Sequence, residues 1–559
     1  MDWQRSALIA AIVVVFGLLF IRWNEYQEAH APAIAATSNE SVLIPPLPEE
    51  AVLAPKIQQN DTSAIPELVQ RVDQVDVQGS AIIENARLVT VNSDVLEVTI
   101  DTLGGDIVRV ALPQHLVSQE PGADPFVMLN RTQSQTYIAQ SGLIGRNGTD
   151  TAAGRPRFSV ASAHYQLQEG DEQVVVDLHL QQDGATLTKR FIFKRDNYLV
   201  DVVYLVENHG SKVWQAHLFG QIQRDSHNPN SNSTMGPNAY LGAALSTDED
   251  KYKKYDFSDM EEGAFKTEKL GGWIAMVQHY FISAWVPDQH ANNSYQLRKL
   301  GSKDLYTMGF TSAAVDVAPG ASGELRAAFY VGPKDQYRME EISPYLDLTI
   351  DYGWLWWVAK PLFYGLTMFH GLVGNWGWSI IFLTFVVKLL FFPLSAASYK
   401  SMARMRKLQP EMARLKELYG DDRQKMSQEM MAFYKKEKVN PMGGCLPMLI
   451  QMPVFIALYW VLNESVELRH APFIFWLTDL SQKDPYYVLP VLNGISMFVL
   501  QTLQPAPPDP MQAKVMRLMP VAFSFFFMFF PAGLVLYWTV NSILSIAQQW
   551  TITRKIIRE

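Results

Sequence analysis

Six stretches of this 559-residue sequence are apolar and almost free of charge. They span residues 7–21, 376–394, 445–462, 486–503, 516–530 and 534–550. As an α-helix the second stretch would measure roughly 28 Å, since each residue adds about 1.5 Å, and that length crosses the hydrocarbon of a bilayer. The pattern predicts a multi-domain membrane protein with an α-helical transmembrane bundle of six spans.

The first stretch fits either a retained membrane anchor or a cleaved signal peptide. A cleavage site needs small residues after the apolar run, whereas this run ends in Ile21-Arg22-Trp23. Tryptophan and a basic residue at both edges also suit a membrane interface. We therefore expect residues 1–24 to be an N-terminal transmembrane anchor. The Ala-, Pro- and Glu-rich residues 25–79 read as a flexible tether.

Residues 80–345 change to a strand pattern. Apolar and polar residues alternate in runs such as 173–180 (QVVVDLHL) and 199–206 (LVDVVYLV), and GG, DG, RDN and NHGS turns separate these runs. Alternation with period two at this spacing predicts a large antiparallel β-sandwich.

The charges are divided unequally between the two parts of the chain. Residues 1–350 carry 27 basic and 43 acidic side chains, whereas residues 351–559 carry 20 and 13. The loop at 395–441 holds eleven Lys and Arg, while 463–484 holds two. Because basic loops stay in the cytoplasm, we expect both termini inside and the β domain in the periplasm, in a multi-pass protein of the bacterial inner membrane.

These expectations divide the second part of the chain into five segments. They are an interfacial amphipathic helix at 346–375, span 2 at 376–394, a cytoplasmic helical hairpin at 395–441, spans 3–6 at 442–550 and a basic cytoplasmic tail at 551–559. Six spans place the two termini on the same side, which agrees with the distribution of basic residues.

Signatures of catalysis are missing from the sequence. It has one cysteine, and it lacks a phosphate-binding loop, an H-E-x-x-H helix and a G-x-S-x-G elbow. Carboxylates of the β domain could in principle serve a sugar-processing site, but the sequence does not pair them, and we favour acidic side chains on a solvated surface. We expect no enzyme, no cofactor, no metal and no small-molecule substrate.

Lys388 is an ionisable residue inside an apolar span. Placing such a residue at mid-membrane costs about 2.5–3.5 kcal/mol on an insertion scale. Either its stem lies along the helix and the ammonium reaches the inner headgroups, or it faces a polar cavity among the spans. Thr384 lies one turn earlier on the same helical face. Polar partners in other spans include Gln451 and the Tyr537-Trp538 pair.

The loop at 395–441 carries a net charge of +5 on two helix-compatible arms. These charges could serve topology alone. They could also form a landing surface for an anionic partner, either lipid headgroups or ribosomal RNA. The basic residues expected on that surface are Arg404, Arg406, Lys407, Arg414, Lys416, Lys435 and Lys436.

Several long motifs closely resemble the YidC family of membrane protein insertases. They include TFVVKLLFFPLSAASYKSMARMRKLQP (384–410), VNPMGGCLPMLIQMPVF (439–455) and MPVAFSFFFMFFPAGLVLYW (519–538). The motif TLGGDIVRVAL (102–112) resembles the form with a large periplasmic domain. The resemblance implies a hydrophilic groove open to the cytoplasm and lipid, together with a periplasmic β-supersandwich similar to sugar-binding mutarotase folds.

The resemblance also implies site residues and partners. By position Thr384, Gln451, Tyr537 and Trp538 match residues that line the groove, and Lys388 stands where the family typically has Arg. Lysine keeps the point charge but lacks the bidentate fork. The implied partners are nascent membrane proteins, the ribosome, the Sec translocon and anionic lipid headgroups. A secondary transporter and a membrane-anchored periplasmic sugar-binding protein remain alternative functions.

Overall fold

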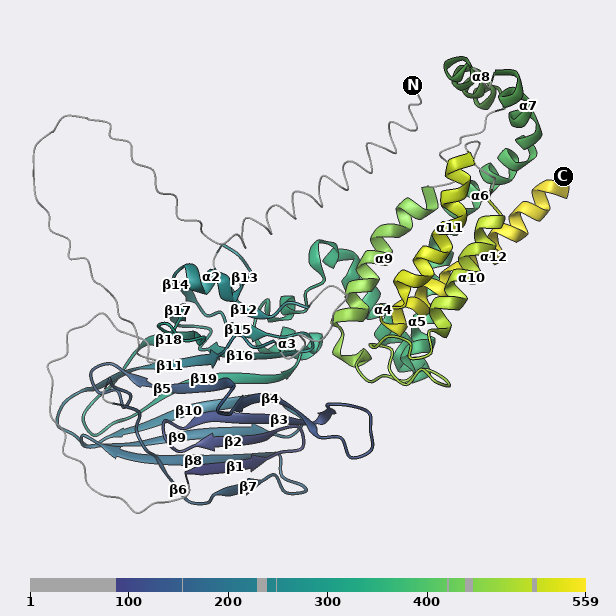
Figure 1. The fold of residues 1–559 in the computed structure, drawn as a ribbon. Coiled ribbons are helices and arrows are strands. Elements are labelled where there is room, and N and C mark those ends of the chain that lie inside the picture. The colour runs from purple at the N-terminus through teal and green to yellow at the C-terminus, as the bar shows by residue number, and fades with distance from the viewer. Residues whose placement is uncertain are drawn as a thin grey trace, which may run out of the picture.

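The computed structural model shows a β domain followed by a helical region (Figure 1). It describes residues 87–152, 154–228, 239–247, 249–419, 422–437, 446–504 and 510–558. The anchor expected at 1–24 and the tether expected at 25–79 lie outside these residues.

The β domain contains a sheet of ten described strands. Its order is β14-β17-β18-β11-β5-β4-β3-β2-β1-β7. The strands are β1 (Leu88–Asn92), β2 (Glu97–Asp101), β3 (Asp106–Leu116), β4 (Pro125–Arg131), β5 (Thr136–Ile144), β7 (His164–Gln166), β11 (Trp214–Arg224), β14 (Phe265–Leu270), β17 (Asn292–Lys299) and β18 (Tyr306–Val317). All neighbours pair antiparallel except β1 and β7, which are parallel.

A second sheet of nine described strands lies against the first. Its order is β13-β12-β15-β16-β19-β10-β9-β8-β6. The strands are β6 (Ser159–Val160), β8 (Gln173–Gln182), β9 (Ala185–Lys194), β10 (Leu199–Asn208), β12 (Gly242–Leu245), β13 (Lys253–Tyr255), β15 (Ile274–Val277), β16 (Phe281–Pro287) and β19 (Ser322–Pro333). The short helix α2 (Phe257–Glu262) follows β13. The expected large antiparallel β domain is confirmed at this level.

Alternation along the strands builds the core between the two sheets. Along β9 every second residue is buried, from Ala185 to Phe193, because successive side chains point to opposite faces of a sheet. Trp285 of β16 contacts Phe310 of β18, with ring centroids 6.1 Å apart, and so joins the two sheets. The β8–β9 hairpin closes through Asp183-Gly184, both at positive φ, as a two-residue turn of the predicted D-G type requires.

Lys189 of β9 connects the two sheets through hydrogen bonds inside the core. Its side chain is fully buried, and its Nζ donates hydrogen bonds to the carbonyls of Gly104 (2.9 Å), Gly105 (2.7 Å) and Ser141 (3.0 Å). Burial lowers the pKa of Lys189 to about 7, whereas the nearby carboxyl of Asp106 works in the opposite direction.

The helical region begins where the β domain ends. Its elements are α3 (Gln336–Ile342), the 3₁₀ turns η1 (Leu346–Thr349) and η2 (Gly353–Leu355), α4 (Trp356–Val373), α5 (Trp376–Leu390), α6 (Phe392–Lys407), α7 (Gln409–Tyr419), α8 (Arg423–Lys436), α9 (Leu446–Glu464), η4 (Val466–Leu468), α10 (Val488–Thr502), α11 (Pro510–Phe527) and α12 (Ala532–Arg558). The interval 346–375, expected as one helix, therefore divides into two 3₁₀ turns and α4, which continues through Pro361.

Helix lengths do not by themselves identify the spans. Among the described helices none is long and apolar enough to qualify alone as a membrane span, and α5 with α6 qualifies only as a pair bent by 67°. The bend falls where Pro393 enters the first turn of α6, because proline offers no N–H to continue the α5 ladder. The six spans stay a prediction.

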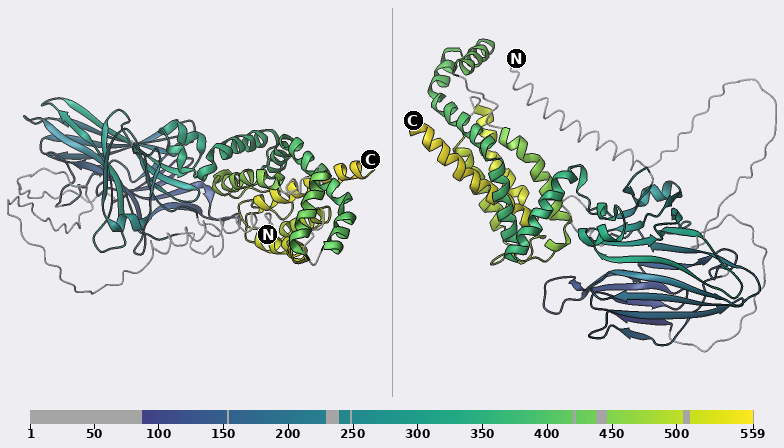
Figure 2. Two further views of the ribbon diagram at one scale, coloured as in Figure 1. Left: turned by 90° about the horizontal axis from the view of Figure 1, so that it is seen from above. Right: turned by 180° about the vertical axis from the view of Figure 1, so that it is seen from behind.

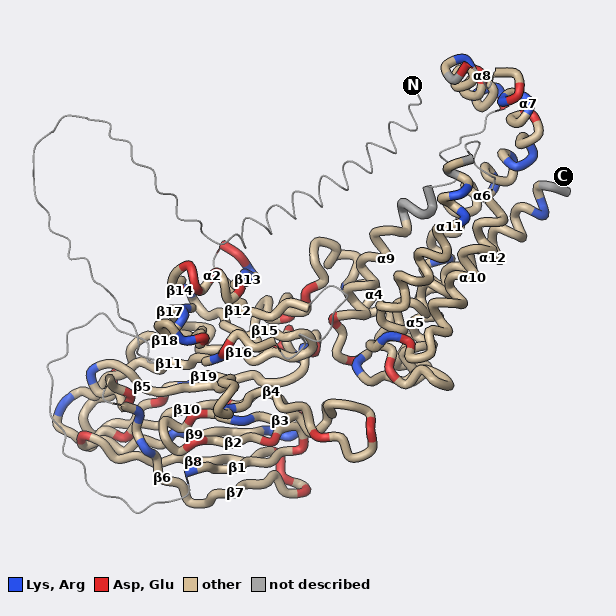
Figure 3. Tube along the Cα trace, in the orientation of Figure 1, with Lys and Arg blue, Asp and Glu red and all other residues tan. Residues whose placement is uncertain are grey.

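The charges follow the two ends of the helical region. Figure 2 shows from two further sides that the β domain lies at one end of this region, while α7, α8 and the C-terminus lie at the other. Lysine and arginine gather on α6, α7 and α8, at the end far from the β domain, whereas acidic residues are frequent in the β domain (Figure 3). The arrangement agrees with the unequal charge of the sequence.

Candidate functional site

Lys388 lies on the inward face of α5. Its side chain is 8% exposed and Thr384, one turn earlier, is 1% exposed. On the opposite side of the same helix large apolar side chains are exposed, among them Val386 and Leu390. A helix with polar residues inward and apolar residues outward is the reverse of a soluble helix and suits a lipid surrounding.

Polar groups from two other helices meet the Lys388 ammonium. Its Nζ donates to Ser545 Oγ of α12 at 2.8 Å and approaches Gln451 Oε1 of α9 at 3.5 Å. The Gln451 amide nitrogen in turn donates to Asn541 Oδ1 of α12. Lys388, Gln451, Asn541 and Ser545 form what we term the polar cluster. The Lys388 ammonium thus points toward polar groups among the helices and does not extend along α5 toward the headgroups.

The sequence contains a signal for Ser545 that its residue type alone does not give. Tyr537, Asn541 and Ser545 follow one another at intervals of four along α12, so they share one face of the helix. Tyr537 is buried and Asn541 and Ser545 bond the α9 and α5 side chains. A polar stripe with this period in an apolar helix indicates that this face of the helix points into the bundle and not toward lipid.

Two of the expected groove residues stand beside the polar cluster without bonding it. Thr384 Oγ1 donates to the Ile380 carbonyl of its own helix at 2.6 Å. Trp538 is half-buried and packs edge-on against Phe455 of α9, with ring centroids 4.3 Å apart, and against Phe527 of α11 at 5.4 Å. Thus one side of the candidate site is hydrogen-bonding and the adjoining side is aromatic.

The basic surface of the hairpin is exposed. The side chains of Arg404, Arg406, Lys407, Arg414, Lys416, Lys435 and Lys436 all reach solvent. The expected first arm divides at Leu408 into α6 and α7, and Asp422 caps α8 by accepting from the backbone N–H groups of Gln424 and Lys425. Tyr434 OH contacts Met412 Sδ at 4.0 Å and joins α8 to α7.

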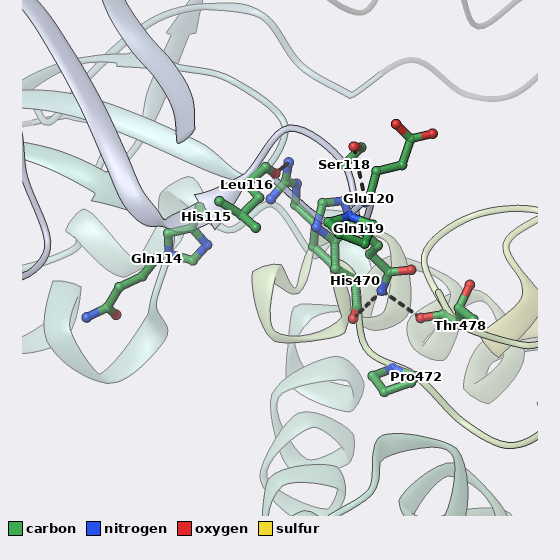
Figure 4. A pocket seen from close by; sticks show the side chains of 11 residues that line it. Gln114, His115, Leu116, Ser118, Gln119, Glu120, His470, Pro472 and Thr478 are labelled. Atoms are coloured by element: carbon green, nitrogen blue, oxygen red, sulfur yellow. Dashed lines mark hydrogen bonds between the residues drawn. The ribbon is translucent and has the colours of Figure 1, made fainter. Parts of the chain in front are cut away.

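A cleft of about 750 Å³ lies between the β3–β4 loop and residues 469–478 (Figure 4). Gln119 crosses it and donates to the carbonyls of His470 and Thr478, both at 2.7 Å. Arg469 donates to the Leu116 carbonyl at 2.6 Å. Burial, with the positive charge of Arg469, lowers the pKa of His115 to about 4. The cleft is thus part of the contact between the β domain and the helical region.

A buried ion pair makes a second contact between the two regions. Lys334 Nζ lies 2.8 Å from Glu464 Oε2, and the two side chains are 2% and 4% exposed. His279 Nε2 lies 2.8 Å from the Asn463 carbonyl oxygen. The sequence did not single out Lys334 and Glu464, because each looks like an ordinary surface charge in its own segment.

Comparison with known proteins decides the family. Residues 88–365 match the family described as the YidC periplasmic domain, and residues 368–559 match the 60Kd inner membrane protein family. The chain is 55% identical to the membrane protein insertase YidC of Cellvibrio japonicus, over 100% of this chain and 99% of that protein. The chain belongs to the YidC family of membrane protein insertases. The family is one of insertases and not of enzymes.

A second relative agrees with the assignment. The YidC insertase of Saccharophagus degradans is 53% identical over 100% of this chain and 99% of that protein. A solved structure of an active YidC insertase aligns with 19% identity and a TM-score of 0.38, covering 83% of this chain and 92% of that chain. As a YidC family member the chain is an inner membrane protein, and its β domain is periplasmic.

Proposed function

We propose that this chain inserts nascent membrane proteins through a hydrophilic groove between α5, α9 and α12. The supporting observation is the polar cluster: Lys388 lies buried among Ser545, Gln451 and Asn541, while α5 exposes apolar side chains on its other side. A cation held in this way attracts an acidic segment of the passing chain. Tyr537, Thr384 and Trp538 line the path that the segment follows.

The topology of the proposal keeps six spans with both termini in the cytoplasm. The basic end of the helical region, at α6, α7 and α8, then faces the cytoplasm (Figure 3), as the excess of Lys and Arg requires. Exposed Trp354, Trp356 and Trp357 lie at the other end, beside the β domain. Tryptophans at this level suit the periplasmic surface of the inner membrane, where the interfacial helix of the proposal lies.

The energy of insertion comes from the substrate. Burial of its apolar helix in lipid releases about 25 cal/mol per Å², whereas passage of its polar end opposes insertion. A groove with hydrogen-bonding groups and a cation lowers that opposing term, because the polar segment exchanges water for fixed dipoles. The segment enters at Lys388 and the apolar helix leaves along the aromatic side at Phe455, Phe527 and Trp538.

The partners of the proposal bind at the cytoplasmic face. The seven exposed cations of the hairpin form a surface for a ribosome or for anionic lipid headgroups, since both present phosphates. The chain acts alone or together with the Sec translocon on its nascent substrates. It hydrolyses no nucleotide, and the driving force is the partitioning of the substrate.

Photocrosslinking tests this path directly. A photoreactive amino acid at Thr384, Gln451 or Trp538 should crosslink to a ribosome-stalled nascent membrane protein. The matched control is Phe385, which neighbours Thr384 but is 51% exposed on the outer face of α5. Strong crosslinks from the three inner positions and weak ones from Phe385 support the groove. Equal yields from all four positions would contradict it.

A deletion separates this function from an activity of the β domain. Removal of most of the β-sandwich, with α3 and the following segment retained, should leave insertion of a nascent protein measurable but reduced, because Lys334 and His279 contact the end of α9. If the chain were instead a periplasmic sugar-binding protein, the same deletion would abolish its activity. Complete loss of insertion in a deletion variant that still reaches the membrane would place the function in the β domain.

A further inference from the structure

The end of α9 nearest the β domain carries an unfavourable charge. The helix ends at Glu464, where the backbone dipole is itself negative and favours cations. The last carbonyls of a helix also need donors from outside. Ser465 supplies donors for one of these carbonyls. Its N–H and its Oγ both donate to the Val461 carbonyl, at 3.1 and 2.6 Å. The remaining groups require partners from elsewhere.

These partners come from the β domain, more than 120 residues away in the sequence. Lys334, directly after β19, pairs with Glu464 at 2.8 Å in a site from which water is excluded. His279, in the turn between β15 and β16, meets the Asn463 carbonyl at 2.8 Å. Because a carbonyl only accepts, His279 donates through Nε2. Burial lowers the pKa of His279, which keeps the imidazole neutral.

The two capping residues are tied to each other within the β domain. The Lys334 backbone N–H donates to the Tyr280 carbonyl at 2.9 Å, and the His279 and Tyr280 rings stack with centroids 3.8 Å apart. The remaining Glu464 oxygen accepts from Asn463 Nδ2 at 3.3 Å. The end of α9 is therefore held by a preformed corner of the β domain.

Among the described residues α9 packs less extensively on the other bundle helices than α12 does. The main helix against which α9 packs is α4, which continues from the β domain through η1 and η2, and its contacts with α6 and α12 are smaller. The side of α9 that faces α5 and α12 presents Gln451 to Lys388 and Asn541. Helix α4 packs on both α9 and α5. The polar cluster therefore joins Gln451 of α9, the helix that the β domain contacts, to Lys388 of α5 and to Asn541 and Ser545 of α12.

We propose that the β domain caps the end of α9 through two residues of the same chain, Lys334 and His279. These two positioning residues fix the position of Gln451 opposite Lys388 and Asn541. The proposal rests on the function proposed for the polar cluster. Loss of the Lys334 cation leaves Glu464 buried without compensation, which a protein relieves by moving the charge toward water. Such movement shifts α9 and widens or closes the groove.

A distance measurement across the groove tests the cap. Spin labels at Met452→Cys on α9 and Ile543→Cys on α12 report the separation in full-length protein in lipid nanodiscs; both positions are exposed, and Cys445→Ser removes the native cysteine. Lys334→Met should shift or broaden the distance distribution and reduce insertion about tenfold. The exchange Lys334→Glu with Glu464→Lys should restore most of both. An unchanged distribution in folded Lys334→Met protein would overturn the proposal.

Controls separate capping from general damage. Lys194→Met breaks the more exposed pair with Asp201, which is 2.9 Å long, and should change neither readout. His279→Gln retains an N–H donor and His279→Leu does not, so only the second should shift the distance. Equal distances in these two variants would contradict the cap even if Lys334→Met failed to fold. A shifted distance with undiminished insertion would leave the cap standing and contradict the function proposed for the polar cluster.

Discussion

Lys189 in the β domain and Lys388 in the helical region are both buried lysines, and their surroundings differ. Lys189 donates to three backbone carbonyls, with the carboxylates of Asp106 and Asp150 close by. Lys388 has a hydroxyl and an amide oxygen as partners, and no carboxylate of the described residues pairs with it. One cation is neutralised by its own domain and the other is not.

The difference separates a charge that stabilises its own domain from a charge that can interact with a substrate. A buried cation that is compensated inside its domain fixes the positions of its neighbours and interacts weakly with anything outside. A buried cation held only by neutral dipoles keeps most of its field, which a passing anionic group can use. On this comparison Lys189 ties two sheets together, whereas Lys388 serves a substrate.

The largest expected effect is on the stability of the β domain. Lys189→Met should destabilise the domain by about 3–5 kcal/mol, because it leaves Asp106 and Asp150 in the core with one cation fewer. Lys388→Met should leave the helical region at least as stable, since no carboxylate loses a partner. Hydrogen-exchange mass spectrometry of strands β8, β9 and β10, compared with α5, measures both.

The exposed pair of Arg190 with Asp177 is the control for this prediction. Its two bonds are as short, 2.7 Å each, but the side chains are 38% and 27% exposed. Arg190→Met should therefore cost less than about 1 kcal/mol. If Lys189→Met were equally mild, the contrast between the two lysines would be lost.

A smaller effect is expected at the cleft between the two regions when the pH falls. The folded chain holds His115 with a pKa of about 4, below its ordinary 6.5, so the unfolded or opened state binds the proton more readily. Stability is therefore complete above pH 6.5 and falls as the pH drops toward 4. At pH 5 the loss is about 2 kcal/mol.

The other titrating and charged groups near His115 are Tyr198, whose hydroxyl lies 3.3 Å from His115 Nε2, and His470, Arg469, Asp479 and Glu120. His470 also has a lowered pKa through burial, so it acts in the same direction. Hydrogen exchange of residues 114–121 at pH 7.5 and pH 5 should show faster exchange at the lower pH. His115→Gln should flatten this dependence; an identical dependence in the variant would assign it to His470 or another group.

The smallest effect per residue is expected at the hairpin. Each of its cations contributes roughly 1 kcal/mol near an anionic surface. The triple variant of Arg404, Arg406 and Lys407 to Gln should therefore weaken sedimentation with phosphatidylglycerol vesicles, and added salt should remove the difference from the native chain.

Three exposed cations of the β domain serve as the control for the hairpin. Lys251, Lys303 and Arg326 are exposed in the same way, but they lie in the acidic region. Their replacement by Gln should not change vesicle binding. Equal losses in the two triple variants would mean that net charge alone determines binding, and the hairpin surface would have no special part.

Local patterns predicted the strands of the β domain well. The runs at 173–180 and 199–206 appear as β8 and β10, and the D-G pair forms the expected hairpin turn at Asp183-Gly184. Alternation and turn chemistry act within a few residues, so one sequence contains them. Strand order does not follow in this way, because β14 joins the sheet edge beside β17 through contacts that no local pattern encodes.

Lys388 and Gln451 of the polar cluster were named from the sequence, but Ser545 and the geometry of the cluster were not. Lys388 stands out as a charge in an apolar span, yet whether it turns inward depends on Ser545, which lies 157 residues further on. The capping pair is harder still, because Lys334 and Glu464 each fit an ordinary exposed position in their own segments. Burial decides their role, and burial arises only when distant elements pack.

A charge exchange between protein and substrate tests the account most directly. Insertion of one membrane protein with an acidic, neutral or basic translocated segment is measured with the native chain, Lys388→Arg and Lys388→Glu. The account predicts that Lys388→Arg retains the preference for the acidic segment, whereas Lys388→Glu loses at least tenfold on the acidic segment and gains on the basic one. Unchanged insertion of all three segments by Lys388→Glu would contradict an attractive role for the buried cation.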